Sequence, residues 1–115
     1  MPTMNKEKLT KLIQAVQEYP EFNMRKYTTC ILGISARLNG HPGATEKEVW
    51  DTGSSNMERD YGLTYAQVTD LTLRLPSASP TRRFLDLEEV TKDMAVDALI
   101  HLRDTGYVVY ADPRD

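Results

Sequence analysis

The sequence predicts an all-α domain, a small orthogonal helical bundle with a short extended C-terminal tail. Apolar residues recur at helical spacing in four segments, which predicts main helices at 5–18, 29–38, 64–74 and 92–105. Residues that cap helices stand at the ends of these segments. The 115 residues are 40% hydrophobic and 27% charged, an ordinary globular composition. We therefore expect residues 1–115 to form a single helical domain.

The first two helices are predicted from different patterns. Residues 5–18 are amphipathic, with Asn5 as the expected cap and Pro20 beyond the end. Residues 29–38 are apolar around most of the helix, which is typical of the buried centre of a domain. Thr28 or Thr29 is the expected cap of this second helix. It also carries a ridge of small side chains, Cys30, Gly33 and Ala36, so we expect Gly33 to lie where another helix crosses.

Short helices are predicted in the middle of the chain. The spacing of Thr45 and Glu48 is that of a capping box, which predicts a helical turn near 46–50. We expect residues 51–55 to break this turn and a second short helix to follow at 56–61, ending at Gly62.

The third main helix has the clearest start in the chain. Thr64 and Gln67 have capping-box spacing, and Leu63 is placed to pack on Val68. The apolar stripe predicted to face the core is Tyr65, Val68, Leu71 and Leu75. Pro76 is expected to end the helix.

An irregular stretch, residues 76–86, separates the last two main helices. Its Arg82–Arg83 pair could bind a carboxylate or a phosphate, but a solvated pair is the favoured interpretation. Thr91 is the predicted cap of the helix at 92–105, and Gly106 is the predicted left-handed stop, with Tyr107 packing back on Leu102. Residues 107–110 are β-prone and are expected to form either an extended tail against the bundle or a lone strand.

Charge and cysteine content limit the function classes. The net charge is −3, with +3 in residues 1–40 and −6 in residues 41–115, so there is no basic face of the kind that binds nucleic acid through phosphates. The apolar stretch Cys30–Ile34 is far too short to span a membrane. With a single cysteine and no signal-like N-terminus, the sequence predicts a cytoplasmic protein.

One nucleic-acid interpretation stays open as an alternative. Residues 56–74 resemble a helix-turn-helix, with a glycine at the turn and apolar residues at the spacing that this motif buries. In that interpretation the side chains that approach DNA are Tyr65, Gln67, Thr69 and Arg74. Glu58 stands where the motif has a small residue, and Asp70 would repel phosphate, so we rank DNA binding below protein binding.

Other reactive side chains favour structural roles. Asp93, Asp97 and His101 share one helical face and could ligate a metal, but the helix dipole also prefers this arrangement. Cys30 with His41 or His101 as a base would make a nucleophile, yet Cys30 stands in the most apolar segment, where a buried thiol is expected. We therefore predict no catalytic residues, no metal and no cofactor.

Three aromatic residues, Trp50, Tyr61 and Tyr65, stand among polar neighbours in the middle of the chain. Aromatic side chains at the edge of a polar surface can anchor a protein partner, although covering a small core is the commoner role. The sequence thus favours a non-enzymatic protein-binding or regulatory module, with a protein partner or self-association and no membrane.

Three segments together resemble small bacterial and phage-borne helical proteins of unknown function. The first is Cys30-Ile31-Leu32-Gly33-Ile34 followed by Leu38-Asn39-Gly40, where those proteins often have Cys-x-x-Gly-x-Ala and this chain has Ser35 and then Ala36. The second is Gly62-Leu63-Thr64 at a helix start. The third runs from Val90-Thr91 to Thr105-Gly106-Tyr107-Val108. The resemblance implies a compact all-α domain and no site residues.

Overall fold

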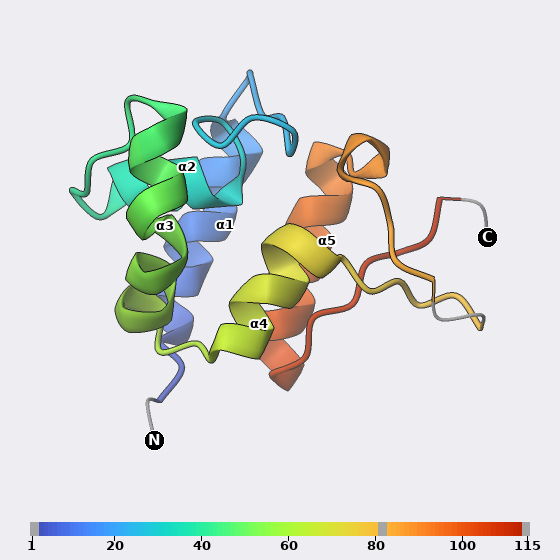
Figure 1. Ribbon diagram of the computed structural model, residues 1–115. Helices are drawn as coiled ribbons and strands as arrows, with labels where there is room; N and C mark the ends of the chain where they lie inside the picture. Colours follow the sequence, from blue (N-terminus) through green and yellow to red (C-terminus); the bar gives the residue numbers. More distant parts are fainter. Residues whose placement is uncertain (1–2, 81–82, 114–115) are drawn as a thin grey trace.

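Five α-helices make up the fold in the computed structural model, which describes residues 3–80 and 83–113 (Figure 1). They are α1 (Lys6–Glu18), α2 (Ile31–Leu38), α3 (Glu46–Tyr61), α4 (Tyr65–Thr69) and α5 (Lys92–Thr105). A π-helical segment, Asp70–Arg74, continues α4, and Leu87–Glu89 forms a 3-10 turn. The described residues contain isolated β-bridges but no strand. The predicted all-α fold class is confirmed.

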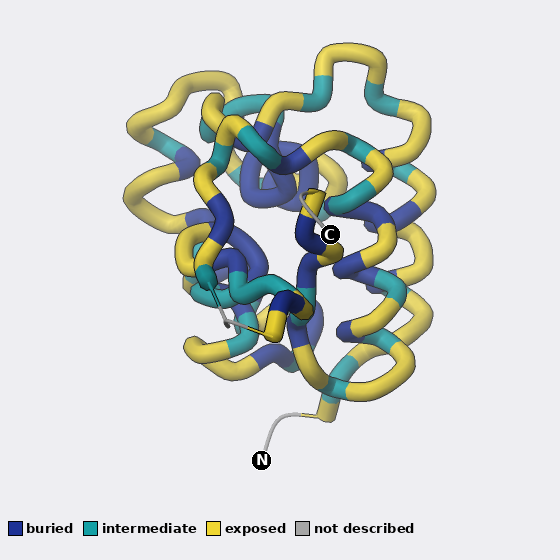
Figure 2. The backbone as a smooth tube through the Cα atoms, turned by 90° about the vertical axis from the view of Figure 1, so that its right-hand side faces the viewer, coloured by how far each residue is buried: buried dark blue, intermediate teal, exposed yellow. Residues whose placement is uncertain are grey.

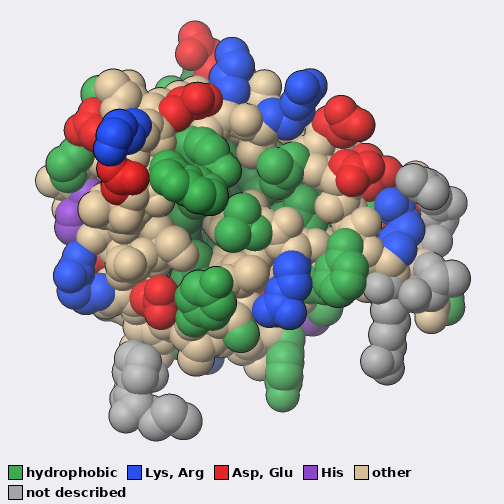
Figure 3. Space-filling view, viewed as in Figure 1, with side chains coloured by type: hydrophobic (Ala, Val, Ile, Leu, Met, Phe, Trp, Pro, Cys, Tyr) green, Lys and Arg blue, Asp and Glu red, His purple; other side chains and the backbone are tan. Residues whose placement is uncertain are grey.

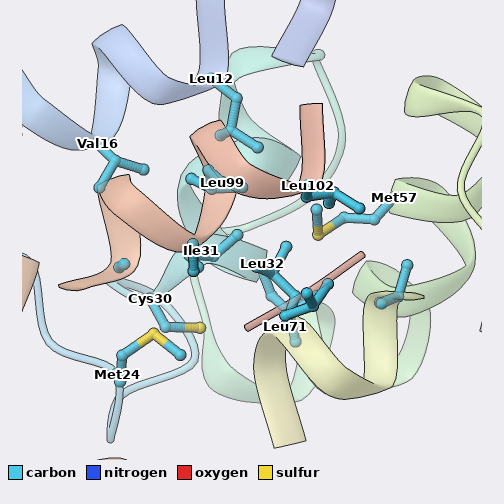
Figure 4. Packing of buried hydrophobic residues seen from close by; sticks show 14 of the residues in the cluster. Leu12, Val16, Met24, Cys30, Ile31, Leu32, Met57, Leu71, Leu99 and Leu102 are labelled. Carbon is cyan, nitrogen blue, oxygen red and sulfur yellow. The ribbon is translucent and has the colours of Figure 1, made fainter. Parts of the chain in front are cut away.

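A single buried cluster joins the helices. α1 packs most extensively on α5 and α2 on α3, while α4 follows α3 on the near side of the molecule (Figure 1). Side chains from α1, α2, α3, the π-helical segment and α5 meet in the centre (Figure 4). Buried positions face this centre and exposed ones face outward (Figure 2). Among the described residues, no helix combines the length and the apolar character needed to cross a bilayer.

Most predicted helix ends are confirmed. The side chains of Asn5, Thr64 and Thr91 each accept a hydrogen bond from a backbone N–H three residues further on. Gln67 completes the capping box of α4, since its side-chain oxygen accepts the N–H of Thr64 at 2.8 Å. Gly106 ends α5 in the left-handed region at φ 83°. These local signals determine the ends because each satisfies a backbone group that the helix leaves unpaired.

The predicted break at residues 51–55 is wrong, because α3 is continuous there. Residues 46–50 and 56–61 are helical as predicted, but within one helix that Thr45 caps and Gly62 ends. The helix passes Gly53 where it meets α2. A Cβ at Gly53 would lie 3.6 Å from the Cβ of Leu32, an ordinary van der Waals contact, so α3 passes close to α2 at this point. Packing against α2 outweighs the low helix propensity of glycine and serine at this point.

The prediction for the start of α2 and for Gly33 is also wrong. Cys30, not Thr28 or Thr29, occupies the N-cap position, and its side chain makes no capping bond. Gly33 does not lie at a helix crossing. A Cβ there would lie 2.2 Å from the carbonyl oxygen of Tyr27 and 2.5 Å from the carbonyl carbon of Thr28. The chain that leads into α2 therefore folds back over Gly33.

The helix predicted at 64–74 ends at Arg74 as an α-helix followed by a π-helical segment, and Leu75 is its C-cap before Pro76. Leu75 adopts a left-handed conformation at φ 53°, and its N–H donates to the carbonyl of Asp70 at 3.1 Å. This bond spans five residues, as in a π-helix. The sequence pattern predicted an ordinary α-helix, because a widened turn leaves the apolar spacing almost unchanged.

The C-terminal tail lies against the 76–86 stretch. The Tyr110 N–H donates to the carbonyl of Pro76 at 2.8 Å, and the Ala78 N–H donates to the carbonyl of Tyr110 at 2.9 Å. Of the two alternatives for 107–110, the extended tail is therefore the one observed. Tyr107 does not pack back on the helix as expected: its side chain is 73% exposed, and Val108 is buried instead.

Arg83 is not the solvated side chain that the sequence predicted. Its guanidinium makes two hydrogen bonds with Asp112, at 2.6 and 2.8 Å, and pairs with Glu89 at 3.1 Å. These carboxylates raise the pKa of the Arg83 guanidinium. Arg82, its expected companion, lies outside the described residues. Arg83 thus joins the 76–86 stretch to the C-terminal tail.

Candidate protein-binding groove

A groove of about 180 Å³ opens between α3 and the α4 helix with its π-helical continuation. Hydrophobic side chains gather across this face of the molecule, over α3 and α4 (Figure 3). We call it the aromatic groove. Its lining consists of Tyr27, Leu32, Trp50, Ser54, Tyr65, Thr69, Thr72 and Leu73.

Large apolar side chains at the groove remain open to solvent. Trp50 is 62% exposed, Tyr65 is 68% exposed and Leu73 is 49% exposed. Tyr65 was expected on the buried stripe of its helix, whereas Val68, Leu71 and Leu75 of that stripe are buried. Clustered apolar exposure around a concavity marks interaction sites more often than single exposed residues do. Burial of the two rings by a partner would remove much apolar surface from water.

The Trp50 ring is supported from behind by Tyr27. The two ring centroids are 5.4 Å apart and the planes are tilted by 55°. Tyr27 belongs to the segment that folds back over Gly33, so the absence of a side chain at Gly33 lets this segment approach α2. The close approach of the Tyr27–Thr28 backbone to α2 therefore positions Tyr27 behind Trp50, on one wall of the aromatic groove.

The continuity of α3 places the other residues of that wall. Trp50 and Ser54 are four residues apart, so they lie on the same face of an unbroken helix. A break over residues 51–55 would have separated them. On the opposite wall, Tyr65 and Thr69 have the same spacing along α4.

The π-helical segment supplies the floor and one end of the groove. Thr72 is buried, and its hydroxyl donates to the carbonyl of Val68 at 2.8 Å. The carbonyl of Leu71 accepts a hydrogen bond from the buried Tyr110 hydroxyl. Leu73, which follows the buried Thr72, has its side chain at the surface. Short π-helical segments are frequent at functional sites, where they redirect individual side chains.

An open trough of about 570 Å³ adjoins the groove and shares Leu73 with it. The trough is lined by Arg25, Leu73, Leu85, Asp86, Leu87 and Glu88. Both carboxylates and the guanidinium are exposed. The described residues show no ion pair between Arg25 and either carboxylate. Acidic side chains also stand along the upper right border of the face in Figure 3.

The residues proposed for DNA contact occupy different settings. Tyr65 and Thr69 line the groove. The side-chain amide of Gln67 makes two hydrogen bonds. Its oxygen accepts the Thr64 N–H at the start of α4, and its nitrogen donates to the carbonyl of Gly106 at 2.8 Å. Arg74 pairs with Asp70 at 3.0 Å. Reading a base with Gln67 would break both of its hydrogen bonds.

Cys30, His41 and His101 each have different surroundings. Cys30 is 3% exposed, and burial raises the pKa of its thiol. His41 pairs with Asp60 at 2.7 Å, and His101 is exposed on α5. Within residues 3–80 and 83–113, no three His, Cys, Asp or Glu side chains come together in a way that could hold a metal ion.

Sequence reasoning found part of the groove. Trp50 and Tyr65 were singled out, but Tyr61 is a core residue that is 1% exposed, with its hydroxyl accepting a hydrogen bond from Asn39 at 2.8 Å. Burial raises the pKa of Tyr61 to about 12. Tyr27 and Leu73 were missed. Tyr27 stands in an irregular segment without periodicity, so no sequence pattern indicates its role. Leu73 lies in the π-helical segment, where the sequence predicts an ordinary α-helix.

The fold and the groove together define a small all-α domain with an exposed aromatic groove. Comparison of the chain with protein-family models, with curated proteins and with solved structures finds no match. The functional assignment therefore depends on the geometry of the groove.

Proposed function

We propose that this protein is a non-enzymatic protein-binding module whose aromatic groove holds an apolar side chain of a protein partner. The observation that carries the proposal is the exposure of Trp50 and Tyr65 on opposite walls of one apolar concavity. Tryptophan and tyrosine are enriched among the residues that dominate binding energy at protein interfaces. We place the protein in the cytoplasm, since its single cysteine suits a reducing compartment.

The size of the groove fits one side chain. An apolar cavity of roughly 150 Å³ binds a benzene-sized molecule, and the aromatic groove measures about 180 Å³. A phenylalanine or leucine side chain between Trp50 and Tyr65 would fill such a space. The groove is thus suited to a single anchor residue with neighbouring segments lying over the surface.

Affinity capture with matched variants tests the proposal. Immobilised wild-type protein and the Trp50→Ala and Tyr65→Ala variants are compared, each with and without nuclease. Tyr107→Ala is the control, because Tyr107 is 73% exposed and does not line the groove. Loss of a central aromatic anchor costs about 2 kcal/mol or more, so recovery of a specific partner should fall at least about tenfold for both groove variants.

The expected result is a partner that survives nuclease, is retained by Tyr107→Ala and is lost with both groove variants. Circular dichroism of each variant verifies that the helices are intact. Capture that is unaffected by Trp50→Ala, or that disappears with nuclease, would contradict the proposal. The second outcome would instead support the DNA-binding alternative.

A further inference from the structure

We infer that the segment held by this protein is basic, with a large apolar side chain in the aromatic groove and a nearby lysine or arginine in the adjoining trough. The inference rests on the proposed function and adds the chemistry of the partner. It starts from the continuity of the two hollows, which share Leu73. A segment anchored between Trp50 and Tyr65 would run past Leu73 to the carboxylates of Asp86 and Glu88.

The carboxylates of the trough have free acceptor capacity. Asp86 accepts the backbone N–H of Glu89 as the cap of the 3-10 turn, which leaves other lone pairs of a carboxylate available. Glu88 is exposed and forms no ion pair within the described ranges. Their position beside three leucines favours a long side chain that combines an aliphatic stem with a charged head, as in lysine and arginine.

Arg25 is the one base in the lining of the trough, opposite two acids. The two acids and one base of the trough therefore leave one net negative charge, and residues 41–115, which include both acids, carry a net charge of −6. Complementary charge at the rim of an interface accelerates association and discriminates against partners of the wrong sign. The positive charge of Arg25 would weaken the attraction for a basic segment. Removing this charge should therefore strengthen binding, in contrast to removing the charges of the two acids.

A second copy of the chain is a less suitable occupant. Lys8 and Lys11 lie beside the exposed Leu38 and would be a basic region for such a contact, but this region is itself a hollow of about 190 Å³. If this hollow faced the aromatic groove of a second copy, neither surface would project into the other. Little apolar surface would then be buried between the two copies. A separate basic segment with a projecting apolar side chain fits the groove better.

Trp50 is the only tryptophan of the chain, so its fluorescence reports directly on the groove. The probes are three blocked peptides: Phe-Ala-Ala-Lys-Lys, its charge-reversed analogue Phe-Ala-Ala-Glu-Glu, and Ala-Ala-Ala-Lys-Lys without the anchor. Each is titrated to millimolar concentration into the full chain at low and at physiological salt. The expected result is a blue shift of Trp50 emission with the first peptide at concentrations at least about threefold lower than with the other two.

Charge variants of the protein test whether Asp86, Glu88 and Arg25 cause the preference for the lysine peptide. Asp86→Asn with Glu88→Gln should weaken binding of the lysine peptide by about three- to tenfold and reduce its salt dependence. Asparagine remains a good cap, so the 3-10 turn is preserved. Glu7→Gln with Asp97→Asn changes the net charge equally at exposed positions outside the trough and should leave binding unchanged. Arg25→Gln should strengthen binding of the lysine peptide.

The outcomes separate this inference from the proposed function. Equal binding of the lysine and glutamate peptides, or an equal effect of both acid-neutralising pairs, would overturn the basic preference while leaving the groove as a docking site. A blue shift that depends on protein concentration alone would show a second copy as the occupant and overturn the inference. No response to any peptide would also overturn it, whereas failure of the proposed function is shown by capture that Trp50→Ala does not change.

Discussion

Gly33 and Gly53 show how one residue type serves two kinds of packing. At Gly33, an added Cβ would meet the backbone of Tyr27 and Thr28 within 2.5 Å. At Gly53, the nearest atom to an added Cβ is a methyl carbon of Val49 at 3.2 Å, followed by the Leu32 side chain. A side chain can shift by a few tenths of an ångström, but the backbone that leads into α2 is held by its own hydrogen bonds.

At the residue scale, we predict opposite outcomes for two alanine substitutions. Gly33→Ala should lower the free energy of unfolding by about 1–3 kcal/mol, because the clash exceeds the gain in helix propensity. Gly53→Ala should stay within about 1 kcal/mol of wild type, since the propensity gain offsets a small displacement of Val49. Urea unfolding followed by circular dichroism measures both. A Gly33→Ala protein as stable as wild type would contradict the close approach described above.

The α4 helix depends on its cap more than longer helices do. It has five residues before the π-helical segment begins, so its own hydrogen bonds are few. Thr64 and Gln67 satisfy each other's backbone N–H groups, and Gln67 also binds the carbonyl of Gly106 at the end of α5. One side chain thus fixes the start of α4 and links it to another helix. This arrangement holds Tyr65 at the edge of the groove.

At the element scale, we predict that Thr64→Ala lowers the free energy of unfolding by about 0.5–2 kcal/mol, the usual cost of a lost N-cap. Thr52→Ala is the matched control. Thr52 is exposed in the middle of α3 and its hydroxyl donates to the carbonyl of Glu48. Its replacement should be neutral or stabilising by up to about 0.7 kcal/mol. Equal destabilisation by both substitutions in thermal or urea unfolding would show that the cap is unimportant.

Across the whole molecule, the C-terminal tail is held by a cluster of charges and by two backbone bonds. Arg83 binds Asp112 through two nitrogen atoms and also reaches Glu89. The tail carries the buried Tyr110, whose hydroxyl binds the carbonyl of Leu71 in the π-helical segment. The tail is therefore connected, through one buried side chain, to the floor of the aromatic groove.

At the scale of the whole molecule, we predict that Arg83→Lys loosens the tail although the charge is kept, because lysine cannot reproduce the two-point contact with a carboxylate. Amide hydrogen exchange should become several-fold faster at Ala78 and Tyr110, whose N–H groups pair the tail with residues 76–78. Amides in the centre of α5, such as that of Leu99, should exchange as in wild type. Unchanged protection at Ala78 and Tyr110 would show that the backbone bonds hold the tail unaided.

The sequence by itself determined the features that depend on neighbouring residues. The helical class, the cap residues Asn5, Thr64 and Thr91, and the stop at Gly106 all follow from local hydrogen bonds that a nearby residue can satisfy. The sequence named Trp50 and Tyr65 as candidate anchors together with Tyr61, but it did not determine their exposure, because Tyr65 also falls on the predicted apolar stripe and Tyr61 is buried. The buried state of Cys30 also followed from its apolar segment.

Only the tertiary structure decided how distant segments meet. The continuity of α3 depends on the contact of Gly53 with α2, and the position of Tyr27 depends on backbone that folds over Gly33. The π-helical turn that exposes Leu73 coincides with the buried bond from Tyr110, about 40 residues away in sequence. Such contacts have no local signature, because their energy comes from burial and pairing between residues that no spacing rule relates. The aromatic groove is formed by those contacts.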